Sequence, residues 1–202
     1  MDRILGPLSQ MGAAIRARDN RYPPLEIQGG SLRAIHYTLP VASAQVKTCV
    51  LLAGLFACGT TSVTEPVATR DHTEIGLRQF GVKMESSRGT ISVRGPASLR
   101  PASLSVPGDL SSAAFFLVAA LAAREAELVI ENVGLNPTRS ALLDFLVSAG
   151  GDLQILDLEQ SGGELCGNVR VRSSRLRGGV IEKKLTAALI DEIPVLAVFP
   201  GA

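Results

Sequence analysis

Apolar residues along this chain recur with two different spacings. A three-to-four-residue spacing predicts helices at residues 43–57, 71–80, 111–123 and 140–149, and a further helix before Gly12. Short alternating or β-branched stretches predict strands at residues 61–65, 82–85, 90–94, 127–131, 152–156 and 168–172. The mixture of helices and short strands indicates an α/β protein.

The predicted elements form a repeat. Residues 39–95 and 106–172 each contain helix, strand, helix and two strands in that order. A short strand before Pro40 and another before Pro107 would make each copy a βαβαββ unit.

Glycines mark the repeat more exactly than the apolar pattern does. Gly12, Gly81 and Gly150 stand 69 residues apart, and each follows an amphipathic helix and precedes a strand. This is where a helix stop with positive φ is expected. The dipeptides Thr69-Arg70 and Thr138-Arg139 show the same spacing, which makes chance agreement improbable.

In this register the chain begins and ends inside repeat units. The first copy retains only one helix and two strands, at residues 4–30, and a further copy begins near Ser173 and would run past Ala202. Near the end, the apolar helix pattern of residues 187–199 is interrupted by Pro200-Gly. We therefore expect a piece of a larger protein or the product of a truncated reading frame.

Composition excludes several classes. The chain has 46% hydrophobic and 19% charged residues, so it can build a core. A net charge of +1, 4% aromatics and no Trp give no support for nucleic-acid binding. The longest apolar runs, residues 49–58 and 113–123, are too short to span a membrane and are predicted to be buried helices.

Three cysteines do not make a disulfide framework. Cys49 and Cys58 lie in an apolar run and are predicted to be reduced core residues of a cytoplasmic protein. Residues 1–10 lack the basic-then-apolar order of a signal peptide. His72 has no second ligand at metal-binding spacing, so we expect no metal. Dinucleotide, Walker and esterase motifs are absent.

Helix starts carry the candidate chemistry. Ser43 and Gln45 open a helix where free N–H groups favour an anion, although Ser43 could be an ordinary N-cap. Arg70 precedes the next helix and could bind a phosphate group, or it could form a salt bridge with Glu65 or Glu74. Glu74, three residues after Asp71, also fits a capping box.

Two further helix starts, at Asp109 and Asn136, are interpreted as structural caps. Asp191 and Glu192 stand in an otherwise apolar run before Pro194. They could cap a helix, or one of them could act in acid–base catalysis while partial burial raises its pKa and the other is solvated.

Together these segments closely resemble the 5-enolpyruvylshikimate-3-phosphate synthase family, in the form of the bacterial class with low glyphosate sensitivity. The resemblance is carried, in order, by Pro40-Val-Ala-Ser-Ala-Gln-Val-Lys47, Glu65-Pro-Val-Ala-Thr-Arg-Asp-His-Thr-Glu74, Val106-Pro-Gly-Asp-Leu-Ser-Ser-Ala113, Asn136-Pro-Thr-Arg139 and Ile190-Asp-Glu-Ile-Pro194. It implies a two-lobed α/β fold built from βαβαββ repeats, with helix N-termini converging between the lobes. Residues 1–100 would be the later part of the first lobe and residues 101–202 the early part of the second.

The resemblance also implies a reaction. The enolpyruvyl group of phosphoenolpyruvate passes to the 5-hydroxyl of shikimate 3-phosphate in aromatic amino-acid biosynthesis, with no metal or organic cofactor. Ser43, Ala44 through its backbone, Gln45 and Arg70 would bind shikimate 3-phosphate. Asp191 would hold the shikimate hydroxyls and act as the base. Lys47 is a weaker candidate, and family members are usually monomeric.

Most of the family's phosphoenolpyruvate-binding residues have no counterpart here, so we expect the 202-residue chain alone to lack turnover. Two alternatives remain open. The chain could be a non-catalytic fragment that binds shikimate 3-phosphate and self-associates through apolar surface. It could also be a relative of UDP-N-acetylglucosamine enolpyruvyltransferase, although the reactive loop cysteine of that branch has no equivalent and residues 69–74 fit the shikimate branch better.

Overall fold

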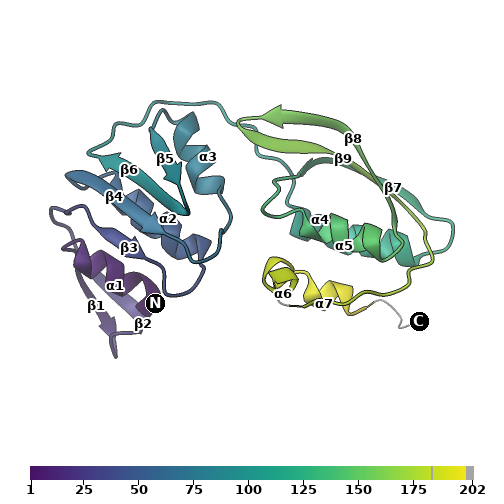
Figure 1. Cartoon of the computed structure of the whole chain (residues 1–202), viewed down its shortest axis with the longest axis horizontal. Coiled ribbons are helices and arrows are strands. Elements are labelled where there is room, and N and C mark those ends of the chain that lie inside the picture. Colours follow the sequence, from purple (N-terminus) through teal and green to yellow (C-terminus); the bar gives the residue numbers. More distant parts are fainter. Residues whose placement is uncertain (183, 199–202) are drawn as a thin grey trace. The chain divides into compact units, whose positions relative to one another are not determined.

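The computed structural model describes residues 1–182 and 184–198, and it divides the chain into two compact units. The first is Met1–Ser103 and the second is Leu104–Ala202. Each is a mixed α/β structure, as the sequence predicts, and each is described by itself (Figure 1). The assignment of the units to two lobes of a larger fold stays a prediction.

The first unit contains one complete βαβαββ repeat. Its elements are β3 (His36–Thr38), α2 (Ala44–Gly54), β4 (Gly59–Thr64), α3 (His72–Gln79), β5 (Met84–Ser87) and β6 (Thr90–Gly95). The strands form one sheet in the order β3-β4-β6-β5. β3 and β4 are parallel, whereas β6 is antiparallel to both of its neighbours. The strand predicted before Pro40 is therefore confirmed.

Before this repeat lies the end of another one. It consists of α1 (Asp2–Gln10), β1 (Ala14–Arg18) and β2 (Tyr22–Gln28). β1 and β2 form an antiparallel pair, with Ala14 opposite Gln28. This agrees with the predicted helix and two strands at residues 4–30.

Helix α2 packs very closely on the sheet of the first unit. A side chain at Gly54 would meet Thr61 and Val93, which lie on β4 and β6. Val50 and Leu51 on the same helix are fully buried. The core of this unit comprises Met11, Leu39, Val46, Val50, Leu51, Leu55, Ala57, Val63, Leu77, Val82, Ile91 and Val93.

The second unit repeats this arrangement without the first strand. Its elements are α4 (Leu110–Ala122), β7 (Glu127–Gly134), α5 (Ala141–Ser148), β8 (Asp152–Ser161), β9 (Glu164–Arg172), α6 (Lys184–Ala188) and α7 (Ile193–Leu196). The sheet order β7-β9-β8 matches β4-β6-β5 of the first unit, and all its strand pairs are antiparallel. The internal repeat predicted from the sequence is confirmed.

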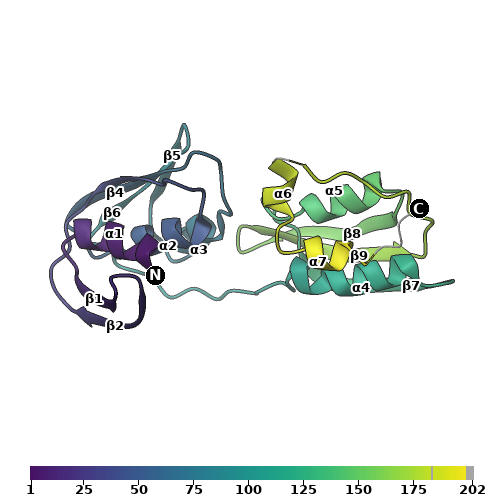
Figure 2. The same cartoon turned by 90° about the horizontal axis from the view of Figure 1, so that it is seen from below.

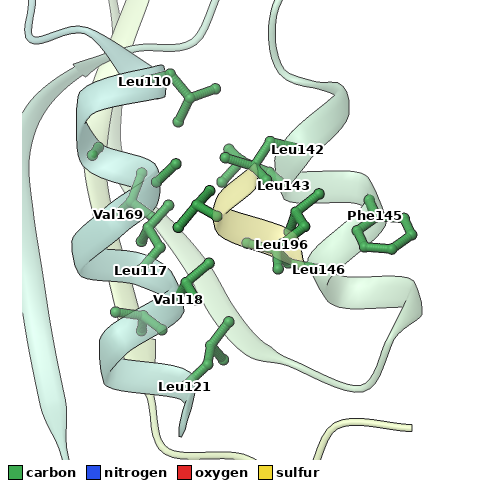
Figure 3. Packing of buried hydrophobic residues seen from close by; sticks show 14 of the residues in the cluster. Leu110, Leu117, Val118, Leu121, Leu142, Leu143, Phe145, Leu146, Val169 and Leu196 are labelled. Carbon is green, nitrogen blue, oxygen red and sulfur yellow. The ribbon is translucent and has the colours of Figure 1, made fainter. Parts of the chain in front are cut away.

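Helices α4 and α5 cover one face of this sheet, and α7 lies between them when they are viewed from below (Figures 1 and 2). Figure 3 shows Leu117 and Val118 of α4 facing Leu143 and Leu146 of α5, with Leu196 of α7 between the two helices. All five side chains are buried. Packing across these three helices forms a large part of the core of the second unit, and Val133, Val169 and Val171 of the sheet complete it.

The three evenly spaced glycines have the same conformation. Their φ angles are +96° at Gly12, +82° at Gly81 and +94° at Gly150. In each case the glycine N–H bonds the carbonyl three residues back, and the next N–H bonds the carbonyl five residues back. This is a Schellman stop, which only glycine adopts without a steric cost. The predicted helix stops are confirmed.

The strand expected before Pro107 is wrong for the described residues. Only an isolated parallel bridge between Gly108 and Val133 stands in its place. Pro101 and Pro107 have no N–H to donate to a sheet, and Val106 is exposed. The apolar run of residues 187–199 contains the end of α6 and the whole of α7, and Glu192 is the N-cap residue of α7 with Pro194 in its first turn, as one predicted alternative for Asp191 and Glu192 has it; residues 199–202 lie outside the described residues.

The prediction of two core cysteines is wrong for Cys58, which is exposed at an isolated bridge with Arg33. Cys49 is half-buried, and burial raises the pKa of its thiol. Cys166 is buried; that burial and the nearby Glu159 carboxylate raise the pKa of its thiol. All three cysteines are free.

The two long apolar runs form helices that are only partly buried. Phe56, just after α2, and Phe115 and Phe116 of α4 are exposed. The prediction of buried helices therefore holds for one face of each helix, which lies in the core, and not for the face that carries these phenylalanines. Among the described residues, none of the helices has the length and apolar character needed to cross a membrane.

Two glycine substitutions test the packing of the first unit. Ala at position 95 would place a methyl group on the backbone carbonyl oxygens of Gly54 and Ala57, whereas nothing lies within 4 Å of a methyl group at position 76 in α3. We expect Gly95→Ala to lower the free energy of unfolding by at least about 1–3 kcal/mol. Gly76→Ala should raise it by about 0.5–1 kcal/mol. Urea denaturation of both variants measures the difference, and equal effects would contradict the packing described here.

Candidate functional site

Ser43 begins helix α2 as its N-cap. Its extended backbone ends the preceding loop, and its Oγ accepts a hydrogen bond from the Val46 N–H at 3.4 Å. The same hydroxyl donates to Oε1 of Gln45 at 3.2 Å. Gln45 is exposed, and Ser43 and Ala44 are half-buried. The ordinary capping role is therefore present, and it leaves an accessible helix start with polar side chains.

Arg70 is half-buried in the loop between β4 and α3. The neighbouring Thr69 donates its hydroxyl to Oε1 of Glu65, and Glu65 lies directly after β4. The Glu65 backbone N–H also bonds the Gly89 carbonyl at 2.9 Å. The two ends of the loop that carries Arg70 are thus linked through the side chain of Glu65.

Lys47, the weaker candidate for substrate binding, is fully buried. Its Nζ lies 3.2 Å from Oε2 of Glu65 and 2.7 Å from Oε1 of Glu74. The two carboxylate side chains are 4% and 5% exposed, respectively. A buried ammonium requires such partners because desolvation would otherwise be very costly. Lys47 therefore acts inside the fold and does not present its charge to a ligand.

The ion cluster of Lys47, Glu65 and Glu74 overturns the predicted capping box. Glu74 is buried against Lys47, and Asp71 makes no capping hydrogen bond as the N-cap of α3. Arg70 is the other predicted partner of Glu65 or Glu74. In the structure, the carboxylates of both residues pair with Lys47. The second oxygen of Glu74 is buried without a hydrogen-bond partner among the described residues.

In the second unit, the cap predicted at Asp109 is confirmed, whereas the cap predicted at Asn136 is wrong, because Ser140 is the N-cap of α5 and Asn136 lies in the turn before it. Asp109 Oδ2 accepts from the backbone N–H and the hydroxyl of Ser112, both at 2.9 Å. Nη2 of Arg139 lies 3.4 Å from Oδ1 of Asp109. Partial burial opposes ionisation of Asp109, but the bonds from Ser112 and the charge of Arg139 outweigh it and lower the pKa of this carboxyl. Asn136 Oδ1 accepts from the Thr138 N–H at 2.8 Å.

Asp191 and Glu192 differ in burial, but in the opposite sense from that expected. Glu192 is 6% exposed, whereas Asp191, the candidate base, is exposed. Glu192 Oε1 accepts from Ser111 Oγ at 2.5 Å, and that hydroxyl also accepts from Arg139. The apolar surroundings expected around the catalytic carboxylate therefore belong to its neighbour. Glu192 holds the turn before α7 against the start of α4.

The predicted residues divide between the two units. Ser43, Ala44, Gln45 and Arg70 lie in the first, where α2 and α3 are joined by a 2.5 Å hydrogen bond between Thr48 and Thr73. Asp191 lies in the second. Within the described part of the chain, no three His, Cys, Asp or Glu side chains form a group that could hold a metal ion.

Sequence reasoning missed the role of the buried charges, although a signal was present. Lys47 falls on the face of α2 that also carries Val50, Leu51 and Gly54, all of which are buried. A lysine on such a face requires acidic partners from other elements. The sequence could have predicted a buried ion pair there, but it could not have identified the partners.

The complete βαβαββ repeat and its second copy without the first strand define a class of α/β proteins, and comparison with known proteins identifies the family within it. The model of the EPSP synthase (3-phosphoshikimate 1-carboxyvinyltransferase) family matches residues 1–200. The chain therefore belongs to the EPSP synthase family.

Individual relatives support the same assignment. The chain is 61% identical over 202 residues to the 3-phosphoshikimate 1-carboxyvinyltransferase of Solibacter usitatus, covering all of this chain and 47% of the relative. It is 52% identical over 201 residues to that of a Synechococcus strain, covering 98% of this chain and 45% of the relative. The solved EPSP synthase of Acinetobacter baumannii matches with a TM-score of 0.86 and 44% identity, over 97% of this chain and 45% of that structure. The chain thus spans about half the length of the relatives it matches.

Removing the buried ammonium tests the ion cluster. Lys47→Met would leave the carboxylates of Glu65 and Glu74 buried without their partner, so we expect the free energy of unfolding to fall by about 3–5 kcal/mol. The matched variant, Lys83→Met at an exposed position, should change it by less than about 0.5 kcal/mol. Urea denaturation followed by circular dichroism measures both. Equal stabilities of the two variants would show that Lys47 is not buried among these carboxylates.

Proposed function

We propose that the protein to which this chain belongs transfers the enolpyruvyl group of phosphoenolpyruvate to the 5-hydroxyl of shikimate 3-phosphate. The hydroxyl oxygen adds to C2 of phosphoenolpyruvate while C3 takes up a proton. The tetrahedral intermediate then loses phosphate from C2 and a proton from C3, which restores the enolpyruvyl double bond on the new ether. The observation that carries this proposal is the match of the family model to residues 1–200, together with 61% identity to a relative named for this activity.

The first unit would contribute binding groups for shikimate 3-phosphate. Helix α2 begins at an accessible turn where the first backbone N–H groups and the helix dipole favour an anion. Ser43, the Ala44 backbone and Gln45 would contact the substrate there. Arg70 can form charge-assisted hydrogen bonds with the phosphate group. These roles rest on the family motif and on the position of the residues beside α2 and α3.

Asp191 in the second unit would hold the shikimate hydroxyls and move the proton. Its carboxylate is exposed in a turn whose neighbour Glu192 is buried and bonded to Ser111. A carboxylate in a turn anchored in this way can approach a substrate hydroxyl without much loss of conformational freedom. No cofactor is required by this chemistry, and the cytoplasmic location expected from the sequence stays a prediction.

Two alternatives are distinguished by experiment. A UDP-sugar acceptor is disfavoured because the relatives described above carry the name of the shikimate enzyme. A fragment that only binds shikimate 3-phosphate would give the binding result below without transferase activity in any larger context.

Titration calorimetry of the 202-residue chain with shikimate 3-phosphate tests the binding role. We expect measurable binding, weakened about 10–100-fold by Arg70→Ala and by a smaller factor by Gln45→Ala, because charged hydrogen bonds contribute more than neutral ones. Arg78→Ala and Gln79→Ala, at exposed positions at the end of α3, are the matched controls. Absence of heat with the unaltered chain would contradict the proposed site.

A chimera tests the transfer reaction. This chain replaces the matched segment of the Solibacter usitatus relative, to which it is 61% identical, and phosphate release is followed with both substrates present. We expect the chimera to be active and Asp191→Asn to lower its kcat by about 10²–10⁴. Asp144→Asn, at an exposed position on α5, should leave kcat unchanged. The 202-residue chain assayed alone provides the background. Full activity of the Asp191→Asn chimera would remove that residue from the mechanism.

A further inference from the structure

We propose that Thr69, acting through Glu65, is a positioning residue that holds the loop of Arg70 in register with the first turns of helix α2. This inference rests on the proposed function, because Arg70 and Ser43 are there assigned to the binding of shikimate 3-phosphate. Thr69 itself is assigned no contact with the substrate. Its role follows from a chain of contacts that runs through the interior of the first unit.

The central link is the carboxylate of Glu65, because its two oxygens serve two different elements. Oε1 accepts the hydroxyl of Thr69, and Oε2 lies 3.2 Å from Nζ of Lys47. The Glu65 side chain is 4% exposed, so little water competes for either oxygen. One buried side chain therefore joins the residue before Arg70 to a residue of α2.

The second link runs from Lys47 to the start of α2. The Lys47 backbone N–H bonds the Ser43 carbonyl at 3.1 Å. The Lys47 ammonium is also held by Glu74 of α3 at 2.7 Å. The ammonium is thus fixed between two carboxylates, and the position of Glu65 is fixed relative to the N-cap of α2.

The loop needs such a link. Pro66, Val67 and Ala68 are exposed and belong to no helix or strand, so they contribute little buried surface to hold the loop in place. A hydrogen bond from Thr69 back to Glu65 closes these residues into a short turn. Closure lowers the number of conformations that Arg70 samples and thereby lowers the entropic cost of binding a phosphate.

The repeat supplies a matched control for this threonine. Thr138 stands 69 residues after Thr69 and also precedes an arginine, but its hydroxyl donates to Asn136 Oδ1 at 2.6 Å. Asn136 in turn donates from Nδ2 to Oε2 of Glu164 at 2.8 Å, a contact made within the second unit, whereas Thr69 is linked to the ion cluster of Lys47 in the first unit. Removing the Thr138 hydroxyl should therefore leave the loop of Arg70 undisturbed.

The test uses the 202-residue chain and titration calorimetry with shikimate 3-phosphate. Thr69→Val keeps the shape of the side chain and the Lys47 ion pairs, and we expect it to weaken binding about 10-fold. Thr69→Ser restores the hydroxyl and should bind within about twofold of the unaltered chain, as should Thr138→Val. In an Arg70→Ala background, Thr69→Val should have little further effect, because a residue that acts through Arg70 loses its influence when Arg70 is gone.

Hydrogen exchange of the ligand-free chain gives an independent readout. The backbone amides of residues 67–70 should exchange faster in Thr69→Val than in Thr69→Ser, whereas amides within α2 should change little. Unchanged exchange and unchanged affinity in Thr69→Val, with Arg70→Ala still weakening binding, would overturn the inference and leave the proposed function standing. Absence of binding by the unaltered chain would overturn the proposed function and this inference with it.

Discussion

The first unit is organised around a charge that cannot be buried alone. Lys47 lies fully inside the protein, and its ammonium requires carboxylates from two other elements. The two ion pairs of Lys47 hold Glu65, at the end of β4, and Glu74, on α3, in fixed positions relative to α2. The polar helix start at Ser43 and the loop of Arg70 take their places from this arrangement. The cluster therefore sets the geometry on which the binding of an anion would depend.

The two units share a framework but fill it differently. Three strands of each have the same order, β4-β6-β5 in the first and β7-β9-β8 in the second, and a glycine stop follows both α3 and α5. In the second unit, however, Asp109 caps the start of α4. Ser111 of α4 accepts a hydrogen bond from Arg139 and donates one to Glu192. The glycine stop is the same in each copy, whereas the residue that caps the first helix differs, Ser43 for α2 and Asp109 for α4.

Local features could be predicted from the sequence because their causes are local. The helix stop at Gly81 and the caps at Ser43 and Asp109 depend on residues a few positions away. Glu74 could not be assigned correctly, since a capping box and a buried ion pair require the same residue type at the same position. Only the tertiary structure decides between them. The burial of Glu192 in place of Asp191 has the same origin, because Ser111 lies 81 positions away in sequence. Which residues of the two units act together stays a prediction from the family resemblance.

The three equal helix stops have an evolutionary consequence. Positive φ at Gly12, Gly81 and Gly150, repeated every 69 residues, is what tandem duplication of one ancestral segment leaves behind. After such a duplication each copy is free to acquire new polar groups, but no copy can exchange its glycine without losing its own stop. Within this chain the copies accordingly agree where their helices end, at the glycine stops, and differ where their first helices begin, at Ser43 in one and Asp109 in the other.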